Sequence, residues 1–228
     1  MTRTGVVIQA RMSSERLPGK VLRAVGDRPV LGCLLDRLAQ AERVDAVVVA
    51  TSDRPDDDPV AAFAEAAGIP VHRGPLEDVL GRFAVAARAA GLEHVVRVSG
   101  DSPLLDPALV DLALRGLAGG RWDAASNVMG ERTYPAGQSV EAMTARTLDR
   151  LDQRTTDPAD REHVTPLLYR RPDLFRVLPI RRAPATRVPH LAVDTPDDLA
   201  RVTEIVGRMR RPQWSYGLDE LLDLSDAA

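Results

Sequence analysis

Short apolar runs alternate with amphipathic segments through the first half of the chain. Residues 5–10, 46–50 and 94–98 are apolar and rich in β-branched residues, and each run ends in polar residues, as buried strands do. Residues 69–71 predict a further short strand. The intervening segments predict four helices. The first begins at Pro29 and has Leu31, Leu34, Leu35 and Leu38 on one face, and the last begins at Asp106 and Pro107. Between them, one helix over 60–67 is ended by Gly68 and one over 77–90 is ended by Gly91. This order predicts an α/β fold with a three-layer, mainly parallel sheet.

The alternation breaks after about Gly119. Residues 124–128 and 139–143 predict two more strands, and 157–170 is helical in part, so we expect a small inserted lobe or dimer arm over about 124–170. The chain then returns to a strand at 190–193 and a helix from Pro196 to about Met209, capped by Asp194 or Thr195. The last four residues, 225–228, are expected to fray. The whole chain, 1–228, is expected to form a single domain.

Composition limits the classes of function. The formal net charge is −3, which argues against a broad nucleic-acid footprint, so no nucleic-acid partner is expected. The one cysteine, Cys33, excludes an intramolecular disulfide framework and a cysteine-built zinc site. No apolar run approaches membrane-spanning length, and the start of the chain runs into a strand-length segment instead of a signal-peptide core. We therefore expect a cytoplasmic protein with no membrane partner.

The segment from Gln9 to Lys20 concentrates cations. Arg11, Arg16 and Lys20 fall within ten residues of loop-like sequence directly after the first predicted strand. Such a loop can hold several cationic donors around one polyanion, and a nucleoside triphosphate is the obvious one. A solvated connection with scattered charges is the alternative, but long ordered loops are commonly functional. The loop lacks the glycine spacing of a Walker loop or a dinucleotide fingerprint, so the residues indicate a polyphosphate site without specifying a reaction.

Two aspartates stand in similar settings. Asp101 follows the strand over 94–98, and Asp194 follows the strand predicted over 190–193. Each could cap a turn or helix, or bind Mg²⁺, which typically takes one or two protein carboxylates. Because ligands bind beyond the carboxyl ends of parallel strands, we expect the polar turns at 9–20, 51–53 and 99–103 to converge.

The same segments resemble the SpsF-like cytidylyltransferase family, which is related to the CMP-KDO and CMP-acylneuraminate synthetases. The resemblance rests on the loop from Gln9 to Lys20, the turn over 99–107 and the segment 193–199. It also rests on two family segments, present here as Arg161-Glu162-His163-Val164-Thr165-Pro166 and as Arg73-Gly74 with Asp78-Val79-Leu80 and Arg82-Phe83. Together they span roughly residues 5 to 205.

The resemblance implies a nucleotide-diphospho-sugar transferase (GT-A-like) fold, CTP as substrate, Mg²⁺ as cofactor and a homodimer. Arg11, Arg16 and Lys20 would be the catalytic cations on the triphosphate. The nucleotide-binding set would comprise Ala10, Arg11, Ser14, Arg16, Lys20, Arg73 and Asp101. Asp101 and Asp194 would bind the metal. Lys20 is expected to contribute most to the transition state.

The second substrate is expected near residues 130 to 165, as a small anionic acceptor such as an acidic sugar, a phosphate or a phosphonate. The candidates for binding it are Tyr134, Gly137, Gln138, Glu141, Arg161 and His163, each of which could instead be structural. The chain departs from the family pattern at Glu15, where threonine is common, and at Ala136 and Ser139, where the family often has acids. The nucleotide half therefore looks intact while the acceptor half has changed.

Two other functions compete with cytidylyl transfer. A GT-A-type glycosyltransferase that uses a nucleotide-sugar would be expected to carry a paired Asp-x-Asp metal site, whereas Ser99-Gly100-Asp101 offers one acid. A non-catalytic nucleotide-binding regulator could have kept the pocket and lost turnover, against which the intact Lys20, Asp101 and Asp194 argue. The predicted function is a Mg²⁺-dependent cytidylyltransferase that moves CMP from CTP to the acceptor and releases pyrophosphate.

Overall fold

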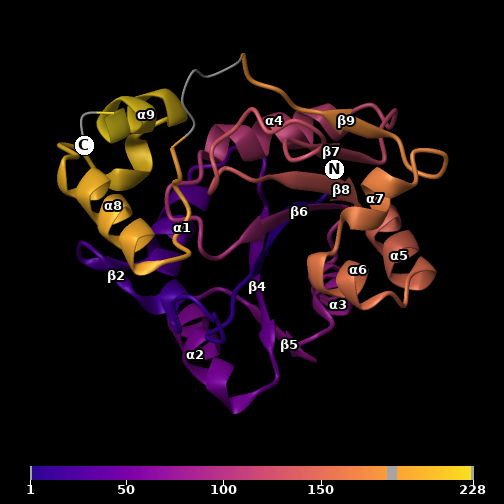
Figure 1. Cartoon of the computed structure of the whole chain (residues 1–228). Helices are drawn as coiled ribbons and strands as arrows, with labels where there is room; N and C mark the ends of the chain where they lie inside the picture. Colours follow the sequence, from indigo (N-terminus) through magenta and orange to yellow (C-terminus); the bar gives the residue numbers. More distant parts are fainter. Residues whose placement is uncertain (1, 184–188, 227–228) are drawn as a thin grey trace.

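A seven-stranded sheet runs through the middle of the molecule (Figure 1). The computed structural model describes residues 2–183 and 189–226. The strands are β1 Thr4–Gln9, β4 Ala46–Ser52, β5 Val71–Gly74, β6 His94–Ser99, β7 Ala124–Ser126, β8 Glu141–Thr144 and β9 Val177–Pro179, in the order β5-β4-β1-β6-β8-β7-β9. Within this sheet β8 alone runs antiparallel to its neighbours. The predicted three-layer, mainly parallel α/β fold is confirmed.

Helices cover both faces of the sheet. One core lies under α1 Val30–Leu38, α2 Asp58–Ala66, α4 Pro107–Leu117, α8 Pro196–Gly207 and α9 Leu218–Asp226. The other lies under α3 Val79–Ala89, α5 Ala145–Arg154, α6 Pro158–His163 and α7 Pro166–Arg170, which are grouped on the right of Figure 1. Side chains alternate between the two cores along β1, with Val6 and Ile8 in the first and Val7 in the second. The central strands are therefore apolar on both faces, as their continuous hydrophobic sequence predicts.

Several short elements complete the fold. They are η1 Lys20–Leu22, the small antiparallel pair β2 Ala24–Val25 and β3 Arg28–Pro29, η2 Pro55–Asp57 and η3 Gln213–Ser215. No helix in the described part of the chain is long and apolar enough to cross a membrane.

Several predicted boundaries are wrong. Residues 190–193 form no strand and make only an isolated bridge between His190 and Ala136, while β9, which the sequence did not predict, pairs with β7. The strand predicted to begin at residue 69 is β5, which begins at Val71. Helix α9 was also missed; it extends to Asp226, so residues 225 and 226 are helical, and residues 227 and 228 lie outside the described part.

The region 124–170 is not a separate lobe. Its two strands, β7 and β8, belong to the central sheet, and its helices contribute to the core under α3. The break in sequence alternation at Gly119 reflects the reversal of direction at β8, because antiparallel neighbours need no helical crossover. That this region also serves as a dimer arm stays a prediction.

Candidate active site

The loop after β1 is folded back on itself and tied to the next strand. The Gly19 amide donates to the Met12 carbonyl at 2.9 Å, which closes the loop. The Met12 amide donates to Asp57 Oδ1 at 2.6 Å, and the other oxygen of Asp57 accepts from the amide and hydroxyl of Ser52 at the end of β4. Asp57 is buried, so its carboxylate is an internal anchor for the loop.

The turn after β6 packs directly against the start of the loop. The Gly100 amide donates to the Gln9 carbonyl at 2.8 Å, and a Cβ added to Gly100 would lie 2.9 Å from the Cβ of Ala10. Only glycine permits this approach. The Val193 amide in turn donates to the Asp101 carbonyl at 2.9 Å. The predicted convergence of the first loop and the Asp101 turn is confirmed, and the Asp194 segment joins them.

Lys20 lies at the centre of this convergence. Its Nζ is 2.5 Å from Asp101 Oδ2 and 2.7 Å from Asp194 Oδ1. Arg16 adds a second cation, with a guanidinium nitrogen 3.1 Å from Asp194 Oδ1. The Lys20 side chain is 12% exposed and those of Asp101 and Asp194 are 18% and 22% exposed, whereas Arg16 is 65% exposed. Four of the predicted site residues therefore form one cluster, with an inner lysine and an outer arginine.

The charges in this cluster reinforce one another. Burial by itself would lower the pKa of Lys20, but the charges and hydrogen bonds of Asp101 and Asp194 outweigh burial, and the pKa is raised. For Asp194, burial would raise the pKa of the carboxyl, but the hydrogen bond and charge of Lys20 and the charge of Arg16 lower it. Lysine and aspartate are thus both ionised over the physiological pH range.

Helix α8 begins immediately after Asp194. The Thr195 side chain accepts from the Asp198 amide at 3.2 Å, and Asp198 Oδ2 accepts from the Thr195 amide at 2.9 Å, which makes a capping box. Of the two predicted caps, Thr195 is the one used. Asp198 Oδ2 also accepts from the Asp194 amide at 3.2 Å. The side chain of Asp194 is therefore left free of the capping role and faces Lys20.

The Asp101–Asp194 pair suits a divalent cation. Among residues 2–183 and 189–226 no group of three or more His, Cys, Asp and Glu side chains could hold a metal ion. Two carboxylates are nevertheless enough for Mg²⁺ when phosphate oxygens and water complete its shell. One oxygen from each aspartate already meets a single cation, the Lys20 ammonium, so the pair defines a cation position between them.

The remaining nucleotide candidates lie around the loop with other partners. A guanidinium nitrogen of Arg11 is 3.6 Å from Glu162 Oε1. The pKa of Arg82 is lowered, first by burial and then by the positive charge of Arg11. Ser14 Oγ accepts from the Leu17 amide at 3.4 Å. Ala10 is buried, and its amide donates to the Ala50 carbonyl. Their contacts with a nucleotide stay predictions.

In the described part of the chain, Arg73 and Glu15 make no hydrogen bond or ion pair with Lys20, Asp101 or Asp194. Arg73 on β5 donates to the carbonyls of Ser52 and Arg54 at 2.9 and 2.8 Å and pairs with Asp58 at 2.7 Å, which fixes the connection after β4. Its predicted contact with the base or ribose stays a prediction. Glu15 is exposed and takes part in no ion pair found in the described part of the chain. An outward-pointing Glu15 resolves the presence of an acid among the loop cations.

Most of the predicted acceptor residues have structural roles. Gln138 is fully buried, accepting from the Asp106 amide and donating to the Leu104 carbonyl. Gly137 has a φ of 89° and lies against the backbone of residues 191–192, where a Cβ would come within 2.5 Å. Tyr134 packs in the core under α1 and α4. Packing accounts for these three residues in the structure, and their contact with the acceptor stays a prediction.

Glu141 and Arg161 belong to internal ion pairs. Glu141 on β8 pairs with Arg97 on β6 and accepts from the Tyr169 hydroxyl, while Arg97 also donates to Gln9 Oε1 at 2.9 Å. This buried network across three strands was missed, although a charge inside an apolar strand is a signal for it. Arg161 pairs with Asp78 at 2.5 Å and Asp152 at 2.9 Å. These ion pairs give both residues a structural role, and their contact with the acceptor stays a prediction. His163 is exposed at the end of α6, and its contact with acceptor stays a prediction.

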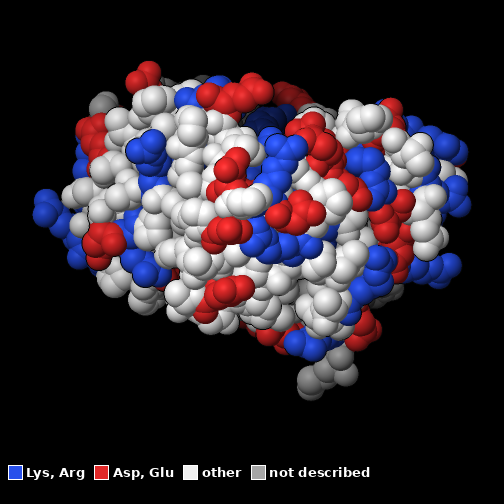
Figure 2. Space-filling view, turned by 90° about the horizontal axis from the view of Figure 1, so that it is seen from below, with Lys and Arg blue, Asp and Glu red and all other residues white. Residues whose placement is uncertain are grey.

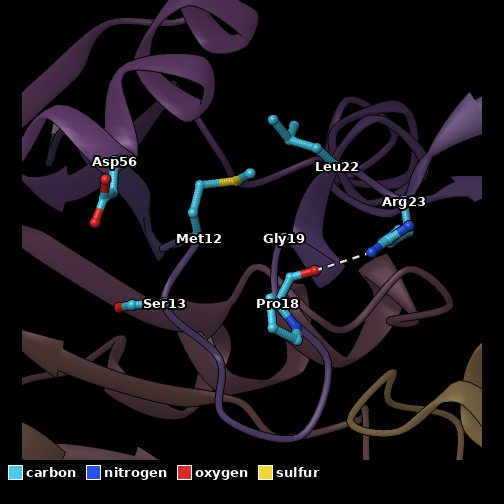
Figure 3. A pocket seen from close by; sticks show the side chains of 7 residues that line it. All are labelled: Met12, Ser13, Pro18, Gly19, Leu22, Arg23 and Asp56. Carbon is cyan, nitrogen blue, oxygen red and sulfur yellow. Dashed lines mark hydrogen bonds between the residues drawn. The ribbon is translucent and has the colours of Figure 1, made fainter.

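Two hollows lie beside the first loop. One of about 540 Å³ is lined by Met12, Ser13, Pro18, Gly19, Leu22, Arg23 and Asp56 (Figure 3). Figure 3 shows the Met12 side chain directed toward Leu22 and Arg23 bonded to the Pro18 carbonyl, at 3.4 Å. A second of about 680 Å³ lies between Leu17, Arg23 and helix α8. Neither lining includes Lys20, Asp101 or Asp194, and the single cation they share makes them poor sites for a triphosphate.

Charge is mixed on one face of the molecule. Figure 2 views the molecule from below the orientation of Figure 1 and shows acidic and basic side chains intermingled on that face. This mixture agrees with the small net charge of −3.

Comparison with known sequences identifies relatives over most of the chain. The cytidylyltransferase family profile matches residues 5–210. The chain is 34% identical over 199 residues to the spore coat polysaccharide biosynthesis protein SpsF of Bacillus subtilis, covering 84% of this chain and 81% of that protein. It is 39% identical over 123 residues to a 3-deoxy-manno-octulosonate cytidylyltransferase of Anaeromyxobacter sp. (strain Fw109-5), covering 53% of this chain and 49% of that protein.

Solved structures share the fold. A cytidylyltransferase from Leptospira borgpetersenii matches with a TM-score of 0.93 and 28% identity, covering 100% of this chain and 95% of that one. A CMP:2-keto-3-deoxy-manno-octonic acid synthetase complexed with CTP matches at 0.69 and 19% identity, covering 91% and 99%. Rv0371c of Mycobacterium tuberculosis in complex with manganese matches at 0.61 and 21% identity, covering 90% and 99%. The last two support the fold alone.

The family profile extends from β1 past the end of α8, and so contains the first loop, Asp101 and Asp194. The resemblance inferred from those segments is confirmed: the chain belongs to the cytidylyltransferase family of nucleotidyltransferases.

Proposed function

We propose that the protein transfers CMP from CTP to an acidic sugar or to a phosphate or phosphonate acceptor, with Mg²⁺ as cofactor and pyrophosphate as product. The observation that carries the proposal is the Lys20 cluster, in which two cations and two carboxylates converge at the carboxyl ends of the strands. A triphosphate is recognised by cations, and its metal by carboxylates, so both halves of a CTP–metal complex find partners there.

The chemistry is a displacement at the α-phosphorus. An acceptor oxygen forms a bond to that phosphorus while the bond to the bridging oxygen of the β-phosphate breaks, and its electron pair leaves with pyrophosphate. Positioning and charge neutralisation supply most of the rate in such reactions. A phosphate or phosphonate acceptor needs no general base, because its attacking oxygen is already deprotonated. The hydroxyl of an acidic sugar would lose its proton to a base or to water, and a bound metal would make that loss easier.

The residues divide this work by their burial. Lys20 is the best shielded of the cations, so its charge is least screened and acts most strongly on the oxygens whose charge grows in the transition state. Arg16 and Arg11 are more exposed and would hold the outer phosphates. Asp101 and Asp194 would hold Mg²⁺, which when bound would neutralise phosphate oxygens and polarise the α-phosphate.

Two comparisons support CTP as the nucleotide. The family is that of cytidylyltransferases, and a solved structure with the same fold is complexed with CTP. A manganese complex of a further structure of this fold makes a divalent cation plausible. The acceptor class is supported by the relative that is named a 3-deoxy-manno-octulosonate cytidylyltransferase.

A pyrophosphate-release assay tests the proposal. The protein is incubated with each nucleoside triphosphate, Mg²⁺ and a panel of acidic sugars, phosphates and phosphonates. Acceptor-dependent release with CTP is the expected result. Binding of CTP without release for any acceptor would favour the non-catalytic regulator, and consumption of a nucleotide-sugar without pyrophosphate would favour the glycosyltransferase.

Arg16→Ala and Arg88→Ala make a matched pair for this assay. Each removes an exposed arginine with a close aspartate partner, but Arg88 pairs with Asp149 on α5, away from the cluster. We expect Arg16→Ala to raise the KM for CTP and Arg88→Ala to leave it unchanged. Equal effects of the two changes would remove Arg16 from the nucleotide site.

A further inference from the structure

The Lys20 ammonium lies in the cation position between Asp101 and Asp194. It donates to one oxygen of each carboxylate at 2.5 and 2.7 Å. Arg16 contacts the same Asp194 oxygen at 3.1 Å. The two negative charges of the pair are therefore matched by two positive side chains, and the cluster is neutral without any added ion.

A metal ion and the Lys20 ammonium cannot share this position. Mg²⁺ binds carboxylate oxygens at about 2.0–2.1 Å and needs the lone pairs that the ammonium now uses. Two cations a few ångströms apart in a partly shielded site also repel strongly. For a metal to bind the pair, Lys20 must first leave it.

The choice of lysine here is exceptional within the chain. Lysine and arginine together number 30, and Lys20 is the only lysine, so the other 29 are arginine. An arginine between two carboxylates would form planar, two-pronged contacts with a large guanidinium. A lysine offers a compact ammonium on a flexible four-carbon stem, which makes and breaks such contacts more easily. The only lysine of the chain therefore lies between the two carboxylates, in the position from which a compact, flexible cation can leave most easily.

We infer that Lys20 is a resident cation that keeps the Asp101–Asp194 pair closed to free metal ions and leaves the pair when a nucleoside triphosphate binds. The phosphates offer Lys20 new anionic partners, and the vacated carboxylates accept the metal that accompanies the nucleotide. Metal binding is thereby made dependent on nucleotide binding. This inference rests on the proposed function of the same cluster.

Direct Mn²⁺ binding without nucleotide tests the inference. Free Mn²⁺ is measured by electron paramagnetic resonance with the natural protein and with Lys20→Ala and Lys20→Arg. Lys20→Ala is expected to bind Mn²⁺ at least about tenfold more tightly than the natural protein, because it frees both carboxylates and removes a positive charge. Lys20→Arg keeps a cation on the pair and should bind as weakly as the natural protein. Adding Asp101→Asn to Lys20→Ala should abolish the gain.

A second measurement needs no variant. Lys20 is the only side-chain amine, so its rate of modification by an amine-reactive reagent can be followed by peptide mass spectrometry. Mn²⁺ alone should leave that rate unchanged, because the metal does not displace the lysine. An increase with Mn²⁺ alone, or Mn²⁺ binding by the natural protein as tight as by Lys20→Ala, would overturn the inference.

The two proposals fail separately. If the natural protein releases pyrophosphate from CTP but binds Mn²⁺ tightly without nucleotide, Lys20 does not close the pair and the function stands. If CTP neither binds nor reacts while Lys20→Ala still gains the Mn²⁺ site, the proposed function fails and the closure by Lys20 stands.

Discussion

Asp198 links the stability of the fold to the position of a predicted metal ligand. Its Oδ2 accepts from the amides of Thr195 and Asp194 and from the Thr195 hydroxyl, at 2.9, 3.2 and 2.8 Å. Its Oδ1 accepts from Arg201 at 2.8 Å and lies 3.2 Å from His190 Nδ1. Burial would raise the pKa of this carboxyl, but the hydrogen bonds from Thr195 and Arg201 outweigh burial and lower it from 3.8 to about 2.

The shift gives both a magnitude and a pH range. A carboxyl pKa that is lower in the folded than in the unfolded protein stabilises the fold at any pH above the unfolded value. A shift from 3.8 to about 2 corresponds to about 2 kcal/mol at neutral pH. The contribution begins to fall near pH 4, is roughly half gone at pH 3 and is lost as the pH passes below the folded value.

Asp198→Asn should therefore cost about 2 kcal/mol in the free energy of unfolding at pH 7 and about half of that at pH 3. Urea denaturation at the two pH values measures both figures. Asp149→Asn is the matched control, since it breaks the exposed pair with Arg88 and should change stability by less than about 0.5 kcal/mol. A cost for Asp198→Asn that is the same at both pH values would refute the reasoning, because the loss would then come from packing or capping and not from charge.

Three further predictions follow from particular contacts. Lys20→Ala and Asp101→Ala should each lower turnover at least about 10²-fold, the scale of one lost electrostatic contact in a transition state, and retained activity in both would remove them from the site. Arg37→Met should cost about 3 kcal/mol in urea unfolding, because the buried Arg37 guanidinium binds the carbonyls of Leu105, Gln213 and Tyr216 and joins the C-terminal segment to α1. A loss of under about 1 kcal/mol would show that those carbonyls find other partners. Light scattering at micromolar concentration should give a homodimer, and a monomer would contradict the resemblance to the family on that point.

The central strands could be predicted because their signal is local. β1 and β4 are buried on both faces, so each appears in the sequence as an apolar run, and β6 follows the same pattern except at Arg97. β9 could not be found in this way, because it is three residues long and contains Pro179, which is typical of an edge strand. Residues 190–193 gave the opposite error. Leu191 and Val193 are apolar because they pack in the core under α1 and α4. The only β-bridge of this segment within the described residues is the isolated one between His190 and Ala136, which is too short to make a strand.

The Lys20 cluster could be predicted because the ends of parallel strands meet at one edge. The order of elements alone brings Lys20 and Asp101 together once β1 and β6 are neighbours. Asp57 was missed because its role depends on contact with the Met12 amide, 45 residues away, which no local pattern shows. The internal partners of Gln138, Glu141 and Arg161 could not be predicted, because a polar side chain with internal partners looks the same in a sequence as one that binds a ligand.

The altered segment after Tyr134 can now be divided into framework and surface. Tyr134, Gly137 and Gln138 are buried, and their packing against residues 104–106 and 191–192 explains why a tyrosine, a glycine and a glutamine suit those positions. Ala136 and Ser139 are half-buried, so their side chains are the ones that border the solvent. These are the two positions at which the chain lacks the acids common in the resembling family. The departures thus fall where a side chain can meet an acceptor without disturbing the core. An anionic acceptor bound beside these two positions would meet less repulsion than it would beside two acids.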